Sequence, residues 1–176
     1  MKWIIVGLGN PGKEYDGTRH NVGRDMVAAL EEKLPAGAKV AELNVYMNNS
    51  GGPIRKLVVS KKAAEKLVVV HDDLDLPLGA VKISFGSGSG GHRGVESIIK
   101  ALKTKNFVRV RVGISPSTSS GRIRKPDSKK IVDFVLGKFK TAELVKLKKV
   151  LKTVEEALGY IVEDGRERAM METNSR

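Results

Sequence analysis

Two polar stretches of the sequence have the residue types of a hydrolytic site. His20 lies on a segment between glycines, just before an expected helix start at Asn21, so we expect an accessible side chain. Residues 71–75 ("HDDLD") directly follow the apolar residues 68–70, which places carboxylates at the end of an expected strand. A carboxylate hydrogen-bonded to an imidazole fixes its tautomer and raises its basicity, as a general base acting on water requires. The simpler interpretations are a surface histidine and a solvated acidic turn.

Other chemistries match the residue spacing less well. His71 and Asp72 are adjacent, and no H-x-x-x-H or calcium-loop spacing occurs, so no zinc or calcium pattern is matched. The serines within residues 84–89 ("SFGSGS") do not form the G-x-S-x-G elbow of serine hydrolases. They lead into residues 90–94 ("GGHRG"), which are either a flexible hairpin loop or a turn whose backbone N–H groups bind a phosphate or an ester oxygen.

The glycines near the N-terminus suggest a dinucleotide-binding loop. Gly7, Gly9 and Gly12 have the spacing G-x-G-x-x-G. In such a loop the last glycine opens a helix that receives the pyrophosphate, and an acidic residue ends the next strand. Residues 13–20 have no apolar period, so no helix is expected there. We therefore interpret the glycines as a turn at the end of the first strand, which presents Asn10 to a ligand.

Strands and helices alternate along the chain and would position these residues. Short stretches rich in branched residues predict strands, and apolar residues at helical spacing predict helices. This mixed order predicts an α/β structure. The expected strands cover residues 3–6, 40–46, 67–70, 80–85 and 108–114, and the expected helices cover residues 22–34, 53–58, 95–102 and 144–161, with Gly165 ending the last and longest helix. Residues 115–130, first serine-rich and then basic, predict an exposed, mobile loop.

The composition favours one domain with a polyanionic partner. A chain of 176 residues suffices for a single core. The 32 Lys and Arg outnumber the 20 Asp and Glu, giving a net charge of +12, which suits either a nucleic acid partner or a lysine-rich solvated surface. Without cysteine there is neither a disulfide nor a thiolate site. Apolar runs are too short for a signal peptide or a membrane span, so we expect a cytoplasmic protein.

Several longer motifs resemble those of one family. The blocks "GLGNPGKEYDGTRHNVG", "YMNNSG", "VVVHDDLDLPLG", "GSGSGGHRGVESII", "VRVRVGI" and "DFVLGKF" occur in the order and wording of bacterial-type peptidyl-tRNA hydrolases, and the resemblance extends to "AMMETN". It implies a single domain over residues 1–176, an α/β fold in which helices flank a twisted mixed β-sheet, and a long C-terminal helix. It also implies a cytoplasmic, monomeric esterase without metal or cofactor, which hydrolyses the ester between a peptide and the 3′ end of tRNA and so recycles tRNA from stalled translation.

The resemblance assigns catalytic roles to residues of both stretches. His20 matches the general base that activates water, and Asp72 matches the carboxylate that supports its basic form. Asn10 matches the asparagine that helps to distinguish blocked from free aminoacyl-tRNA. An ester is activated relative to an amide, so one positioned base with donors for the oxyanion should suffice, without a covalent nucleophile.

Further residues are expected to contact the tRNA. Asn48 matches the asparagine that holds the substrate near the ester, and Tyr15 and Tyr46 occupy the family's aromatic tRNA-contact positions. The positive charge would hold the acceptor stem through its phosphates, with Lys82 and Arg111 as candidate contacts. The simpler interpretation of these two cations is that they are solvated strand residues.

One departure from the family pattern supports a second hypothesis. The family has asparagine where this chain has Arg93, so a long cation replaces a polar ligand near the substrate. This change could weaken catalysis or recruit a phosphate. The second hypothesis is an RNA-binding relative without turnover, which would bind tRNA with strong salt dependence and leave the ester intact. A third is a nucleotide-binding domain, which would bind NAD or ATP.

Overall fold

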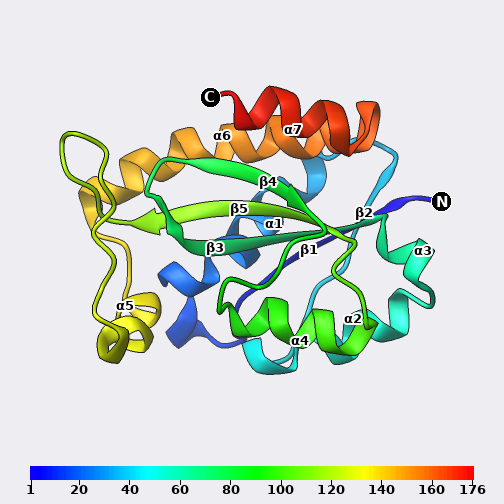
Figure 1. The fold of residues 1–176 in the computed structure, drawn as a ribbon, viewed down its shortest axis with the longest axis horizontal. Coiled ribbons are helices and arrows are strands. Elements are labelled where there is room, and N and C mark those ends of the chain that lie inside the picture. Colours follow the sequence, from blue (N-terminus) through cyan, green and yellow to red (C-terminus); the bar gives the residue numbers. More distant parts are fainter.

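The computed structural model describes residues 1–176 and contains a five-stranded mixed sheet with helices on both faces (Figure 1). The strand order is β2-β1-β3-β5-β4. Neighbouring strands are parallel except for β4, which is antiparallel to β5. The strands are β1 (Trp3–Gly7), β2 (Ala38–Val40), β3 (Leu67–Pro77), β4 (Val81–Phe85) and β5 (Val108–Ser115).

The helices form a layer on each face of the sheet (Figure 1). On one face, α1 (Val22–Leu30) and α6 (Thr141–Asp164) pack on the sheet, and α7 (Arg166–Asn174) follows α6. On the other face, α2 (Gly51–Leu57) and α4 (Arg93–Leu102) pack on the sheet. Two short helices, α3 (Lys61–Ala64) and α5 (Ile131–Leu136), lie in the connections. The expected α/β class, mixed sheet and long C-terminal helix are confirmed.

The sheet is apolar on both sides because both sides are covered. Along β3, Val68 and Val70 belong to the core under α1 and α6, whereas Leu67 and Val69 belong to the core under α2 and α4. All four side chains are fully buried. Strands buried on both faces are continuous apolar runs rather than alternating ones, and this explains the "LVVV" that precedes the polar residues of β3.

The prediction of a strand over residues 40–46 is wrong over most of its length. The structure has only the short β2 there, and the residues from 41 onward leave the sheet. The guanidinium of Arg24, on α1, donates to the main-chain oxygen of Leu43 and to the side chain of Glu42. These contacts hold the segment against α1, so its branched residues lie outside the sheet.

The expected helices are found with shifted ends, and three further helices occur. Helix α1 ends at Leu30 and continues as a 3-10 turn. Helix α6 ends at Asp164 and is followed by Gly165, which has a φ of 92°. Among the additional helices, α3 has only 4 residues, and α7 buries only Ala169 and Thr173, so neither produces a long apolar period. No helix combines the length and the hydropathy needed to cross a lipid bilayer.

Candidate active site

A cleft of about 530 Å³ lies beside the carboxyl ends of β1 and the apolar part of β3. In open α/β sheets this is where ligands bind. All the residues expected at the site line this cleft, except Lys82 and Arg111. The lining residues among them are Asn10, Tyr15, His20, Tyr46, Asn48, Asp72 and Arg93. Segments far apart in the sequence therefore contribute to one concave site.

Two histidines bind opposite oxygens of one buried carboxylate. Nδ1 of His20 lies 2.9 Å from Oδ2 of Asp72, and Nε2 of His92 lies 2.7 Å from Oδ1. Nδ1 of His92 accepts a hydrogen bond of 3.3 Å from the main-chain N–H of Val95, so Nε2 carries the proton that His92 donates to Asp72. When His20 donates its Nδ1 proton to Asp72 in the same way, its Nε2 keeps a lone pair for the cleft.

Asp72 stays ionised although it is buried. Burial alone would raise the pKa of this carboxyl, but His92 and His20 outweigh that effect and hold the pKa well below its usual range. An ionised carboxylate can accept from both rings at once and stabilise a positive charge on His20. The geometry therefore suits a general base that gains and releases a proton.

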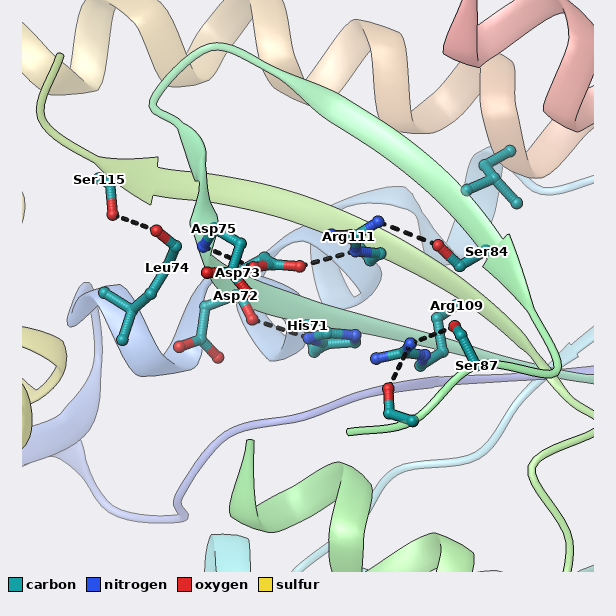
Figure 2. Close-up of polar contacts among 12 residues, drawn as sticks. His71, Asp72, Asp73, Leu74, Asp75, Ser84, Ser87, Arg109, Arg111 and Ser115 are labelled. Atoms are coloured by element: carbon teal, nitrogen blue, oxygen red, sulfur yellow. Dashed lines mark hydrogen bonds and ion pairs between the residues drawn. The ribbon is translucent and has the colours of Figure 1, made fainter. Parts of the chain in front are cut away.

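His71 is a third histidine beside this cluster. Its Nδ1 donates to the main-chain oxygen of Asp72 at 2.7 Å (Figure 2), and its ring packs against that of His92 with centroids 4.8 Å apart. Burial, together with the nearby His92, lowers the pKa of His71 well below its ordinary value. Its Nε2 is buried without a hydrogen-bond partner. His71 therefore supports the ring that binds Asp72 and adds no charge to the site.

The neighbouring Arg19 anchors His20. Both belong to the 3-10 turn Arg19–Asn21 that leads into α1. The buried guanidinium of Arg19 pairs with Glu143 of α6 at 3.2 Å and lies over the ring of Phe134 on α5, with 4.4 Å to the centroid. Its main-chain N–H donates to Gly137 at 3.0 Å. The position of His20 thus depends on a buried cation fixed by two helices.

Asn10 connects the first turn to the segment that carries Asn48. The main-chain N–H of Asn10 donates to Oδ1 of Asn21 at 2.8 Å, and Nδ2 of Asn21 donates back to the main-chain oxygen of Asn10 at 2.9 Å. The side-chain oxygen of Asn10 accepts from the main-chain N–H of Met47 at 2.8 Å. The amide N–H groups of Asn10 stay available to a ligand in the cleft.

Close packing explains the first two glycines of the G-x-G-x-x-G pattern. A Cβ atom at Gly7 would lie 2.3 Å from the main-chain oxygen of Gly23, and one at Gly9 would lie 2.7 Å from Cβ of Arg24. Both contacts are to α1, which begins at Val22 and not directly after the glycines. The pattern lets the end of β1 approach α1, without the helix opening that a dinucleotide needs.

A buried arginine holds the glycine-rich loop that precedes His92. Arg109 of β5 is 5 % exposed and donates to Oγ of Ser87 at 2.5 Å and to the main-chain oxygen of Gly88 at 2.8 Å (Figure 2). Burial lowers the pKa of this guanidinium. The loop then ends at His92, which caps α4.

The expected substrate contacts lie around the cleft with free polar groups. The rings of Tyr15 and Tyr46 meet edge to face, with centroids 6.3 Å apart, and Tyr46 is 56 % exposed. Asn48 and Arg93 are exposed and have no hydrogen-bond partner for their side chains within the protein. These four side chains can bind a ligand without first breaking an internal polar contact.

Lys82 and Arg111 lie outside the cleft and bind other parts of the protein. They are paired opposite each other on β4 and β5. Nζ of Lys82 donates to the main-chain oxygen of Asn174 at 2.6 Å. Arg111 donates to Asp73 at 2.6 Å and to Ser84 at 3.0 Å (Figure 2). A phosphate would have to compete with these contacts, so their role in binding tRNA stays a prediction.

The two histidines and the carboxylate that they bind are the residues in the cleft that could hold a metal ion. The candidate ligand atoms of His20, Asp72 and His92 all lie within 4.8 Å of one another. A metal needs the lone pair of each imidazole, but His92 presents its protonated nitrogen to Asp72, because its other nitrogen accepts from Val95. The donors are therefore arranged for hydrogen bonds rather than for coordination.

His92 is the main site residue to which the sequence analysis gave no role. It was visible only as part of the "GGHRG" loop, 20 residues beyond its partner Asp72. The available signal was its place between a glycine-rich turn and a helical apolar pattern, which is also the place of His20 before α1.

The fold and the site together define an α/β protein in which a histidine and aspartate pair lines a cleft at the carboxyl ends of the strands. Comparison with known proteins identifies the family. The family profile described as peptidyl-tRNA hydrolase matches residues 4–176, so the chain belongs to the peptidyl-tRNA hydrolase family.

Individual relatives agree with this assignment. The chain is 41 % identical over 187 residues to the peptidyl-tRNA hydrolase of Aquifex aeolicus (strain VF5), covering 95 % of this chain and 93 % of the relative. It is 35 % identical to that of Thermodesulfovibrio yellowstonii over 188 residues, covering 95 % and 96 %. The crystal structure of the Acinetobacter baumannii peptidyl-tRNA hydrolase superimposes with a TM-score of 0.83 at 28 % identity, covering 99 % of this chain and 95 % of that one.

Proposed function

We propose that this protein hydrolyses the ester bond between a peptide and the 3′ end of tRNA, with His20 as the general base. The observation that carries the proposal is the hydrogen bond of 2.9 Å between Nδ1 of His20 and the ionised, buried Asp72 in the cleft. It leaves Nε2 of His20 as a base for water. Membership of the peptidyl-tRNA hydrolase family supports the choice of substrate.

The proposed reaction needs one base and donors for the oxyanion. Nε2 of His20 takes a proton from a water molecule, and the oxygen of that water attacks the ester carbonyl carbon. The resulting oxyanion is stabilised by amide N–H groups in the cleft, with those of Asn10 and Asn48 as candidates. The intermediate collapses, the ribose oxygen leaves, and His20 returns the proton to it. Asp72 stabilises the imidazolium between these two steps.

The substrate proposal also assigns roles to the surroundings of the cleft. Tyr15 and Tyr46 present aromatic faces and edges on which nucleotides can stack. The net charge of +12 favours a polyanionic partner such as tRNA. We place the reaction in the cytoplasm, where translation supplies the substrate, and expect the protein to act as a monomer.

The direct test measures release of the acetylated amino acid from N-acetyl-aminoacyl-tRNA. We expect the parent protein to cleave this substrate and to spare the unblocked aminoacyl-tRNA. His20→Ala should lower kcat by about 10³, because it removes the general base. Binding of uncharged tRNA serves as the control and should be nearly unchanged in the variant.

The alternative of an RNA-binding relative gives a different result. A parent protein that binds tRNA in a salt-dependent way, but releases no acetylated amino acid, would contradict the hydrolase proposal. Recovery of cleavage in Arg93→Asn would then identify Arg93 as the cause of the lost activity.

A further inference from the structure

The cleft contains one unpaired cation. Arg93 is the only lysine or arginine that lines it, and its side chain is exposed at the first residue of α4. It has neither an ion-pair partner nor a hydrogen-bond partner in the protein. By contrast, Arg19 and Arg111, which lie nearby, pair with Glu143 and Asp73. The guanidinium of Arg93 is therefore free to bind an anionic group of a ligand in the cleft.

The proposed substrate carries one anion at a fixed place relative to the ester. The ester is on the 3′-terminal ribose, and the 5′ oxygen of the same ribose carries the last internucleotide phosphate. A cleft that places the ester at His20 must therefore place this phosphate only a few bonds away. Arg93 directly follows His92, which binds the same carboxylate as His20. The phosphate and the free guanidinium thus belong to the same small region.

We propose that Arg93 binds this 3′-terminal internucleotide phosphate and so makes the protein favour esters on a nucleic acid over esters on a free nucleoside. The inference rests on the proposed hydrolase function. A phosphate is the better match than a peptide carboxylate, because every such substrate carries the phosphate whatever its peptide sequence. The planar guanidinium can bind two phosphate oxygens at once, so a lysine would replace it only in part.

The test compares one ester on three carriers. The substrates are the N-acetyl-aminoacyl esters of adenosine, of a trinucleotide and of intact tRNA, and only the adenosine ester lacks a phosphate. Arg93→Gln should raise KM about tenfold for the two carriers with phosphate, with kcat within about twofold. The loss should be smaller on the adenosine ester, so the preference of the protein for the trinucleotide ester over the adenosine ester should decrease. Arg93→Lys should give an intermediate KM.

A matched control separates a local contact from a general loss of charge. Lys100 lies on the same helix, is exposed, and does not line the cleft. Lys100→Gln therefore removes the same charge, and we expect the trinucleotide ester to be cleaved as by the parent. The salt dependence of trinucleotide binding should decrease by about one unit of slope in Arg93→Gln and stay unchanged in Lys100→Gln.

Two results would overturn the proposal: an equal loss on the adenosine ester, or no loss on any carrier. Failure of the hydrolase function is recognised separately, because the parent would then cleave none of the three esters. In that case, fluorescence anisotropy with the uncharged trinucleotide decides, and equal affinity of the parent and Arg93→Gln would contradict the phosphate contact.

Discussion

His92 donates to the oxygen of Asp72 that His20 leaves free, so one buried carboxylate lies between two imidazoles. The two rings are themselves close, with centroids 5.1 Å apart. A carboxylate fixed from both sides cannot rotate away from His20 without losing a hydrogen bond. The pair therefore makes His92 a positioning residue for the proposed base, acting through Asp72.

Replacing His92 tests this positioning role. His92→Phe keeps a ring of similar size but removes the N–H that binds Asp72. We expect kcat for N-acetyl-aminoacyl-tRNA to fall about 10- to 100-fold, because a buried ionised oxygen loses its partner. His92→Gln places an amide N–H near the same oxygen and should retain more of the activity. Steady-state kinetics of both variants provide the measurement.

The split between kcat and KM distinguishes positioning from substrate binding. If His92 acts through Asp72, KM should stay within about threefold of the parent value in both variants. A raised KM with an unchanged kcat would instead make His92 a substrate contact and contradict the positioning role.

Most strands and the α/β class could be predicted because they depend on local pattern. The continuous apolar run "LVVV" of β3 results from burial on both faces of the sheet. The apolar residues at helical spacing in α4 result from burial on one face of the helix, and both patterns appear directly in the sequence. The segment after β2 could not be predicted, because its path depends on Arg24 of α1. Branched residues favour a strand, but here a side chain distant in sequence determines the conformation.

The site shows the same division between local and distant information. His20 and Asp72 could be selected from their residue types, from the helix start after His20 and from the apolar run before Asp72, and the structure brings them together. The expected strand end at residue 70 is wrong, because β3 continues through Asp72 to Pro77. The role of His92 depends on the approach of two segments that sequence spacing does not reveal. Likewise, Lys82 and Arg111 carry the charge expected of tRNA contacts, but only the structure shows their bonds to Asn174 and Asp73.

The buried neutral His71 predicts a pH dependence of stability. Its pKa is well below the value of about 6.5 expected in the unfolded chain. As the pH falls below 6.5, the unfolded state gains a proton that the folded state does not. The free energy of unfolding therefore decreases toward acid, by up to about 1.4 kcal/mol per pH unit, until the folded-state pKa is reached.

His71→Asn removes this contribution while keeping an N–H near the main-chain oxygen of Asp72. Urea unfolding of parent and variant at pH 7 and pH 5 is the measurement. The stability difference between them should shrink by up to about 2 kcal/mol on going to pH 5, because only the parent loses stability through this histidine. Asp72 does not interfere in this range, since its lowered pKa affects stability only below about pH 4. A difference independent of pH would mean that His71 is protonated equally in both states.

Gly23 predicts a large and specific cost for one added methyl group. A Cβ atom there would lie 2.1 Å from the main-chain oxygen of Val70, so α1 would have to move away from β3. We expect Gly23→Ala to lower the free energy of unfolding by about 3 kcal/mol. Because α1 follows His20 directly and β3 carries Asp72, kcat should fall as well.

Gly159→Ala is the matched control for this prediction. Gly159 also lies in a helix, α6, but a Cβ atom there would have nothing within 4 Å. Alanine at this position should stabilise the protein by up to about 1 kcal/mol through its higher helix propensity, and kcat should not change. Urea unfolding and ester cleavage of the two variants are compared with the parent. Equal stability of the two variants would show that α1 can shift on β3 at little cost. An unchanged kcat in Gly23→Ala would show that such a shift leaves the distance between His20 and Asp72 intact.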